Sequence, residues 1–146
     1  MKDVLNDLPE YLSWANGLAL QMVRANQTPE LVRIMAHILG CERVWADRIL
    51  GQTTAAVPWP DWELAECERR IAENAGLYRS IVRGVDAAQD IHFTTMRGDA
   101  YTMTAGVLVL QIFTHGAYHR GQMAQDVRRA GGEFVDTDYF LFQLSR

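Results

Sequence analysis

The stretch Thr114-His115-Gly116-Ala117-Tyr118-His119-Arg120-Gly121-Gln122 holds two of the four histidines of this 146-residue chain. It lies in residues 104–130, which we predict as the last long helix, ended by Gly131-Gly132. Residues four positions apart share one face of a helix, so the imidazoles of His115 and His119 can reach a common point. The pair is either half of a transition-metal site or two partly buried histidines satisfied by hydrogen bonds.

Three earlier segments also have apolar residues at helical spacing: residues 7–25, 28–50 and 61–82. The second begins at Thr28-Pro29-Glu30, which combines a capping hydroxyl, a proline at the first position and an acid in the first turn. We expect Asp7 to cap the first helix, with Pro9 in its opening turn, and Asp61 to cap the third.

The segment between the third and fourth helices has a different pattern. Ile91, Phe93 and Thr95 alternate with His92, Thr94 and Met96, and Arg97-Gly98-Asp99 predicts a turn before Tyr101. We therefore expect a short hairpin or extended insertion here. Residues 1–146 are predicted to form a single all-α domain, a four-helix bundle with this insertion.

Composition limits the classes of function. Apolar residues make up 49% and charged residues 22% of the chain, and the net charge is −4, which gives little support for nucleic-acid binding. The longest apolar run, residues 105–113, is too short to span a membrane. Cys41 and Cys67 make no disulfide framework, and we expect a cytoplasmic protein.

His37 changes the interpretation of the histidine pair. It lies about 100° around the second helix from Ile38, at the border of the apolar stripe. With His115 and His119 it can complete a site of three imidazoles, which leaves an open position, as in catalytic zinc sites. The alternative is an ordinary border histidine. His92 is interpreted as a surface or mouth-lining residue.

Two other metal chemistries are disfavoured. Gly116 stands where a His-Glu-x-x-His protease has its glutamate, and no acid precedes either histidine by three positions, as a di-iron bundle requires. Each glycine in the last helix makes that helix less stable than alanine would, so we expect an offsetting gain from close backbone packing or from room beside a bound ion. We interpret Cys41 and Cys67 as small buried residues. Tyr118, Arg120 and Gln122 are interpreted as supporting or substrate-facing groups. The four tryptophans are interpreted as core or core-edge residues: Trp14, Trp45, Trp59 and Trp62.

The chain resembles a known family over almost its whole length. Residues 115–122 resemble the H-x-x-x-H-R-G-Q signature of the DinB/YfiT-like metalloenzyme family. The segment from His37 to Trp45 is similar to its first-histidine segment, Tyr11 to Asn16 to its opening helix, and the Arg97-Gly98-Asp99 turn to its inserted hairpin.

This resemblance implies a homodimeric four-helix bundle that binds one divalent metal ion, usually nickel or zinc, through His37, His115 and His119. Characterised relatives include thiol-dependent transferases and isomerases that use bacillithiol or mycothiol. We expect a metal-dependent enzyme of the thiol S-transferase type, which activates a low-molecular-weight thiol or water, with catalytic residues not yet identified. The alternatives are a structural or sensory ion without turnover, and a helical dimerisation module with incidental histidines.

Overall fold

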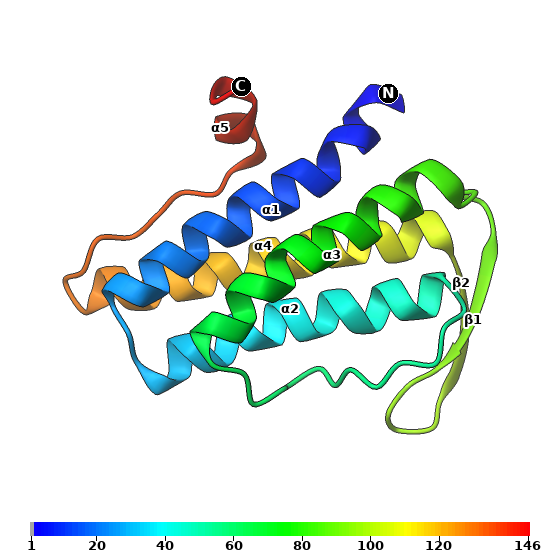
Figure 1. Cartoon of the computed structure of the whole chain (residues 1–146), viewed down its shortest axis with the longest axis horizontal. Coiled ribbons are helices and arrows are strands. Elements are labelled where there is room, and N and C mark those ends of the chain that lie inside the picture. The colour runs from blue at the N-terminus through cyan, green and yellow to red at the C-terminus, as the bar shows by residue number, and fades with distance from the viewer. Residues whose placement is uncertain (1) are drawn as a thin grey trace.

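The computed structural model describes residues 2–146. Its four long helices, α1 (Lys2–Ala25), α2 (Pro29–Ile49), α3 (Leu64–Gly84) and α4 (Ala105–Arg129), form a bundle (Figure 1). A hairpin of β1 (Asp90–Thr94) and β2 (Ala100–Thr104) connects α3 to α4, and the short α5 (Tyr139–Leu144) follows. The predicted helical bundle with an inserted hairpin is thus confirmed.

Two helix starts follow from capping hydroxyls that the sequence displays. Thr28 Oγ1 accepts a hydrogen bond from the Leu31 amide at 3.2 Å at the start of α2. Thr104 Oγ1 accepts from the Val107 amide at 3.5 Å at the start of α4. These side chains satisfy amides that have no partner within the helix.

The other two predicted starts are wrong. Helix α1 begins at Lys2, so Pro9 lies inside the helix and Asp7 does not cap it. Packing of Leu8 against the core stabilises the turn before the proline, whose ring removes one helical hydrogen bond. Helix α3 begins at Leu64, because the preceding chain, Asp61 included, continues the loop that lies along α2.

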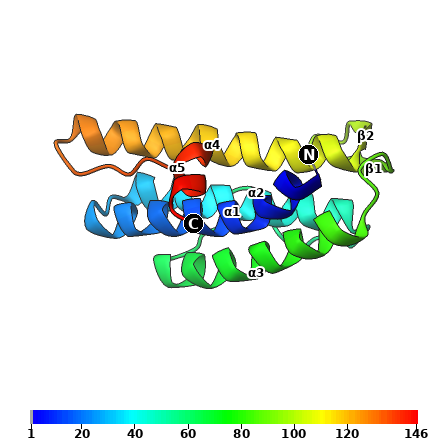
Figure 2. The same cartoon turned by 90° about the horizontal axis from the view of Figure 1, so that it is seen from above.

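The connections set how the helices are arranged. The loop of residues 50–63 runs back along the bundle, so α2 and α3 point the same way (Figure 1). Helix α2 packs against both α3 and α4, and α1 packs against α3. The hairpin lies at one end of the bundle, with β1 on α2 and β2 on α4, and α5 packs on α1 (Figure 2). In residues 2–146 no helix combines the length and apolar character needed to cross a membrane.

The core consists of two apolar clusters. One includes Leu12, Tyr78 and Ile112, and the other includes Leu20, Ile38 and Met123. On each long helix, a buried polar residue stands at the change from one cluster to the other. We call these four residues the polar layer; they are Asn16, Glu42, Asn74 and Arg120.

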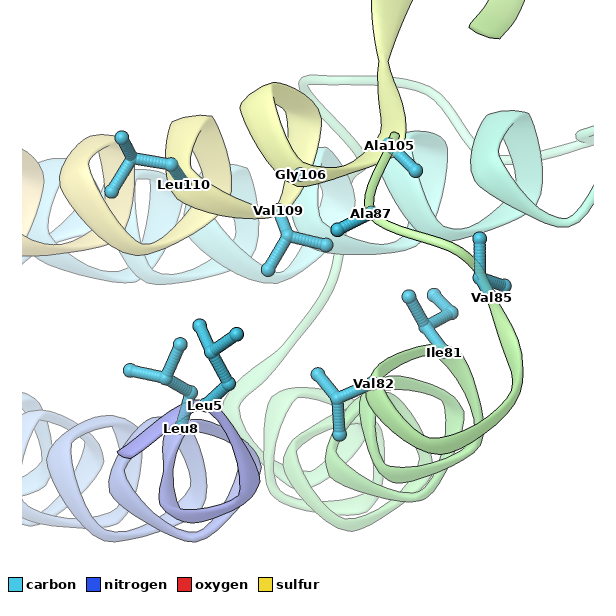
Figure 3. Close-up of a pocket in the computed structure, with 10 residues that line it drawn as sticks. All are labelled: Leu5, Leu8, Ile81, Val82, Val85, Ala87, Ala105, Gly106, Val109 and Leu110. Atoms are coloured by element: carbon cyan, nitrogen blue, oxygen red, sulfur yellow. The ribbon is translucent and has the colours of Figure 1, made fainter. Parts of the chain in front are cut away.

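A small aliphatic cavity lies where α1 and α4 begin and α3 ends. Its volume is about 110 Å³, and Leu8, Val82 and Val109 are among the residues that line it (Figure 3). Every lining residue is aliphatic or glycine, so the cavity offers no side-chain hydrogen bond to a ligand.

Candidate metal centre

Three of the four histidines lie together between α2 and α4. His37 projects from α2, and His115 and His119 project from successive turns of α4. One ring nitrogen of each lies within 4.8 Å of the others. The ring centroids are 4.5 Å apart for His115 and His119, and 5.0 and 4.7 Å from His37 to His115 and His119. We call these three residues the histidine cluster.

His92 lies outside this cluster. Its ring is exposed on β1, where Nδ1 and the Thr102 hydroxyl are 2.7 Å apart. The spacing argument thus identified the two α4 histidines, the border position identified His37, and the interpretation of His92 as a surface residue agrees with the structure.

Hydrogen bonds determine the tautomers of two of the three rings. Nδ1 of His37 is 2.7 Å from the carbonyl oxygen of Pro58, which can only accept, so this nitrogen carries the hydrogen. Likewise Nδ1 of His119 donates to Oε1 of Gln122 at 3.1 Å. In both rings Nε2 keeps its lone pair, and such outer hydrogen bonds orient metal-binding histidines.

Burial favours the neutral form of two of the three histidines. It lowers the pKa of His37, which is 6% exposed, although the hydrogen bond to Pro58 acts in the opposite direction. Burial also lowers the pKa of His115 to about 4, with a further decrease from the nearby His119 and His37. At neutral pH these two histidines therefore present unprotonated nitrogens, the form that binds a metal ion.

The three residues fit a transition-metal ion. Imidazole nitrogens bind zinc at about 2.0–2.1 Å, so two ligands of one ion lie at most about 4.2 Å apart. A spacing within 4.8 Å needs only a small contraction, which side-chain rotation can supply. Imidazole also suits nickel, copper and iron, so the donor set alone selects no single metal.

The loop before α3 covers His37. The Trp59 indole stacks on its ring, with centroids 3.6 Å apart and planes at 12°, and the Arg33 guanidinium carbon lies 4.3 Å from the indole centroid. A side chain at Gly40 would place its Cβ 2.7 Å from the Val57 carbonyl oxygen and from Pro60 Cδ. The loop can therefore approach α2 this closely only because residue 40 is glycine.

Trp59 is the site residue that the sequence argument missed. It is 48% exposed, so its assignment to the core or core edge is wrong. Trp14, Trp45 and Trp62 are half-buried against the two apolar clusters, as expected. The Val57-Pro58-Trp59-Pro60 stretch contained a usable signal, because two prolines stiffen a loop that presents an aromatic ring.

Both cysteines are buried and free, in agreement with their interpretation as small core residues. The Cys41 sulfur lies 3.6 Å from His37 Nδ1, but burial raises the pKa of this thiol to about 12. Burial likewise raises the pKa of Cys67 to about 11. Metals bind the thiolate, so neither cysteine is prepared to act as a ligand.

Arg120 follows His119 in the sequence but points into the core. The guanidinium is 2% exposed and donates to Asn16 Oδ1 at 2.9 Å, to the Tyr11 hydroxyl at 3.1 Å and to Thr137 Oγ1 at 3.3 Å. A Cβ at residue 116 would lie 2.8 Å from Arg120 Nη1. Gly116 thus makes room for an arginine, one of the compensations that a glycine in this helix requires.

Glu42 completes the polar layer. Its carboxylate accepts hydrogen bonds from Asn16 Nδ2 at 2.7 Å and from Asn74 Nδ2 at 3.0 Å. Burial raises the pKa of Glu42 to about 7, although these bonds and the charge of Arg120 oppose the shift. Asn16 bonds to both Glu42 and Arg120, so its amide joins the two opposite charges.

The motif of residues 115–122 supplies two histidines of the cluster, the arginine of the polar layer and the glutamine that bonds to His119. The family model of the DinB family matches residues 1–145. The chain belongs to the DinB family. Searches among curated proteins and among solved structures gave no match. This protein is therefore a helical DinB-family bundle with a three-histidine cluster that could bind a metal ion.

Proposed function

We propose that this DinB-family protein binds one divalent transition-metal ion, nickel or zinc, through His37, His115 and His119. The observation that carries the proposal is the convergence of three imidazole nitrogens within 4.8 Å. Two further features support it: Pro58 and Gln122 hold rings with Nε2 unprotonated, and burial lowers the pKa of two of the histidines.

We further propose that the protein is a metal-dependent enzyme that acts on a small molecule, of the thiol S-transferase type. Three protein ligands leave coordination positions for a substrate. When bound, a divalent ion on neutral imidazoles deprotonates a coordinated thiol and lowers the pKa of coordinated water to roughly 7. In the overall reaction a thiol sulfur forms a bond to an electrophilic carbon, the leaving group departs with the bonding pair, and the thiol proton passes to solvent.

The residues around the cluster have separate tasks in this proposal. Pro58 and Gln122 orient the His37 and His119 rings through the hydrogen bonds described above. Trp59 covers one face of His37 and excludes water there. Tyr118 is 71% exposed, and its ring centroid lies 5.0 Å from that of His119, so it can contact a substrate that approaches from solvent.

Metal stoichiometry tests the first part of the proposal. Protein purified without a histidine tag should bind about one zinc or nickel ion per chain, and His115→Ala and His119→Ala should each reduce the affinity at least tenfold. His92→Ala is the matched control, because it removes the one histidine outside the cluster. Equal metal content in His119→Ala and wild-type protein would contradict the site.

Rate measurements test the second part. Zinc or nickel loading should increase the conjugation of a low-molecular-weight thiol to an electrophile, and His119→Ala should abolish the increase. Chelation that lowers the melting temperature while metal loading leaves the rate unchanged would instead support an ion with a structural or sensory role.

The homodimer implied by the family is checked by sedimentation equilibrium of the loaded protein.

A further inference from the structure

A groove lies between the end of α2, residues 51–58 of the next loop, and residues 92–96 of the hairpin. We call it the hairpin groove; its volume is about 510 Å³. Its lining contains no aspartate or glutamate, although the whole chain has a net charge of −4. Arg48, Gln52, His92 and several threonines supply its polar side chains. The groove is therefore a locally favourable place for an anion on an acidic protein.

Arg48 is held in position within this groove. Its guanidinium carbon lies 4.6 Å from the Trp45 ring centroid and 5.0 Å from that of Phe93, and Nη2 donates to the Thr94 carbonyl at 3.3 Å. The rings themselves meet edge to face, with centroids 5.3 Å apart. These contacts order the side chain before any ligand arrives, which reduces the entropy lost on binding.

Among the described side chains, those of residues 5–146, Arg48 has no carboxylate partner. The adjacent Asp47 pairs with Arg43 instead, at 2.8 Å. Burial lowers the pKa of Arg48, the effect expected for a partly desolvated cation without a counter-ion. The hydrogen bond to Thr94 leaves most of the guanidinium N–H donors available, in the planar arrangement that suits carboxylate and phosphate oxygens.

The groove leads toward the histidine cluster. His37, Cys41, Val44 and Arg48 follow one another at spacings of four, three and four, so they share one face of α2. Arg48 is close enough to Cys41 for its charge to oppose the rise that burial causes in the thiol pKa. Pro58, whose carbonyl accepts from His37, also lines the groove. Along the helix the rise from His37 to Arg48 is about 16 Å.

We propose that the hairpin groove binds the anionic group, a carboxylate or a phosphate ester, of an extended small molecule through Arg48. The other end of this molecule reaches the histidine cluster, a placement that rests on the proposed function. The enzyme would thus act on an anionic substrate or an anionic thiol, and Arg48 would act as a positioning and specificity residue.

An NMR titration of the metal-free full chain tests the proposal without interference from carboxylates that bind the metal. The probes are succinate, glycerol 3-phosphate and the neutral succinamide. We expect either anion to shift the amide signals of residues 51–54 and 92–96, and the tighter of the two identifies the preferred group. Arg48→Met should weaken binding about tenfold or more, because a charge-assisted pair is lost. Arg48→Lys should give an intermediate loss, because it keeps the charge without the planar fork.

Arg83→Met is the matched control, because Arg83 is an exposed arginine outside the groove, and its affinity should stay within about twofold of wild type. Equal shifts with succinamide, unchanged affinity in Arg48→Met, or shifts confined to the aliphatic cavity around Val82 and Val109 would overturn the proposal. If Arg48→Met does not fold, Arg48→Lys decides, and wild-type affinity in that variant also overturns it. Metal stoichiometry, measured separately, should not change in the Arg48 variants, so failure here is distinct from failure of the metal site.

Discussion

His119 and Arg120 are neighbours in the sequence, yet their side chains belong to two different polar regions. His119 is half-exposed in the histidine cluster, where its Nδ1 has a partner and one of its ring nitrogens lies within 4.8 Å of a ring nitrogen of each of the other two histidines. Arg120 is 2% exposed in the polar layer, where its donors bond to Asn16, Tyr11 and Thr137. The histidine cluster has nitrogen lone pairs that can bind a metal ion, whereas the polar layer uses its polar groups in hydrogen bonds within the protein.

The difference between the two regions is whether their polar groups satisfy one another within the protein. In the polar layer, opposite charges are joined through Asn16, which offsets the cost of desolvating them. In the histidine cluster, three like groups are brought together with no acid among them, an arrangement that becomes favourable when a cation binds. Polar groups that are clustered and left incompletely satisfied therefore mark the binding region, whereas burial alone does not.

The largest expected effect comes from breaking the polar layer. Arg120→Met should reduce the free energy of unfolding by roughly 3–5 kcal/mol in the metal-free protein, because Asn16 Oδ1 and the Tyr11 hydroxyl lose a buried charged donor and Glu42 loses the cation that favours its ionised form. Urea unfolding followed by circular dichroism measures this. Arg83→Met removes an exposed arginine and should change stability by less than about 0.5 kcal/mol. A similar small change for Arg120→Met would mean that the layer contributes no more than the surface does.

A second effect concerns pH. The pKa of Glu42 is raised by burial to about 7, above its ordinary 4.5, so its neutral form stabilises the fold. This contribution is complete below pH 4.5 and is lost as the pH rises through 7. Wild-type protein should therefore lose on the order of 3 kcal/mol relative to Glu42→Gln between pH 4.5 and 8. Taking the difference between the two proteins cancels the opposite titration of His37 and His115. A constant difference would show that Glu42 has an ordinary pKa.

The smallest expected effect concerns zinc binding at the histidine cluster. Gln122→Ala should weaken zinc binding about tenfold, because the His119 ring loses the acceptor that orients it, while the stability of the metal-free protein stays within about 0.5 kcal/mol. Gln125→Ala, an exposed glutamine on the same helix, serves as the control for isothermal titration calorimetry. Identical zinc affinities for the two variants would remove Gln122 from the site.

Much of the fold could be predicted from local chemistry. The capping hydroxyl at Thr28 predicted the start of α2, and the alternation after Ile91 predicted the hairpin. The start of the last helix was also predicted at Thr104, whose capping bond the structure shows. Asp61 and Pro9 misled the prediction because tertiary contacts overrode the local signal: the loop along α2 delays α3, and core packing extends α1 past its proline.

The site was predictable only in part, for a related reason. The spacing of His115 and His119 reports on one helix and can be read directly from the chain. The stack of Trp59 on His37 joins residues 22 positions apart through a loop path that no periodicity encodes. The inward direction of Arg120 depends on the space beside Gly116, which becomes evident only when the arginine side chain is placed against the helix.

The hydrogen bonds of Arg120 also have a consequence for rates. They attach α4 to α1 and to the C-terminal segment one residue away from His119, so α4 cannot rotate or slide without breaking them. Two of the three histidines are therefore fixed before an ion arrives. The loop that carries Trp59 lies over the third through a stacked ring and one carbonyl contact. We expect the exchange of ions and substrates to follow the opening of this loop, with the helices as a rigid frame.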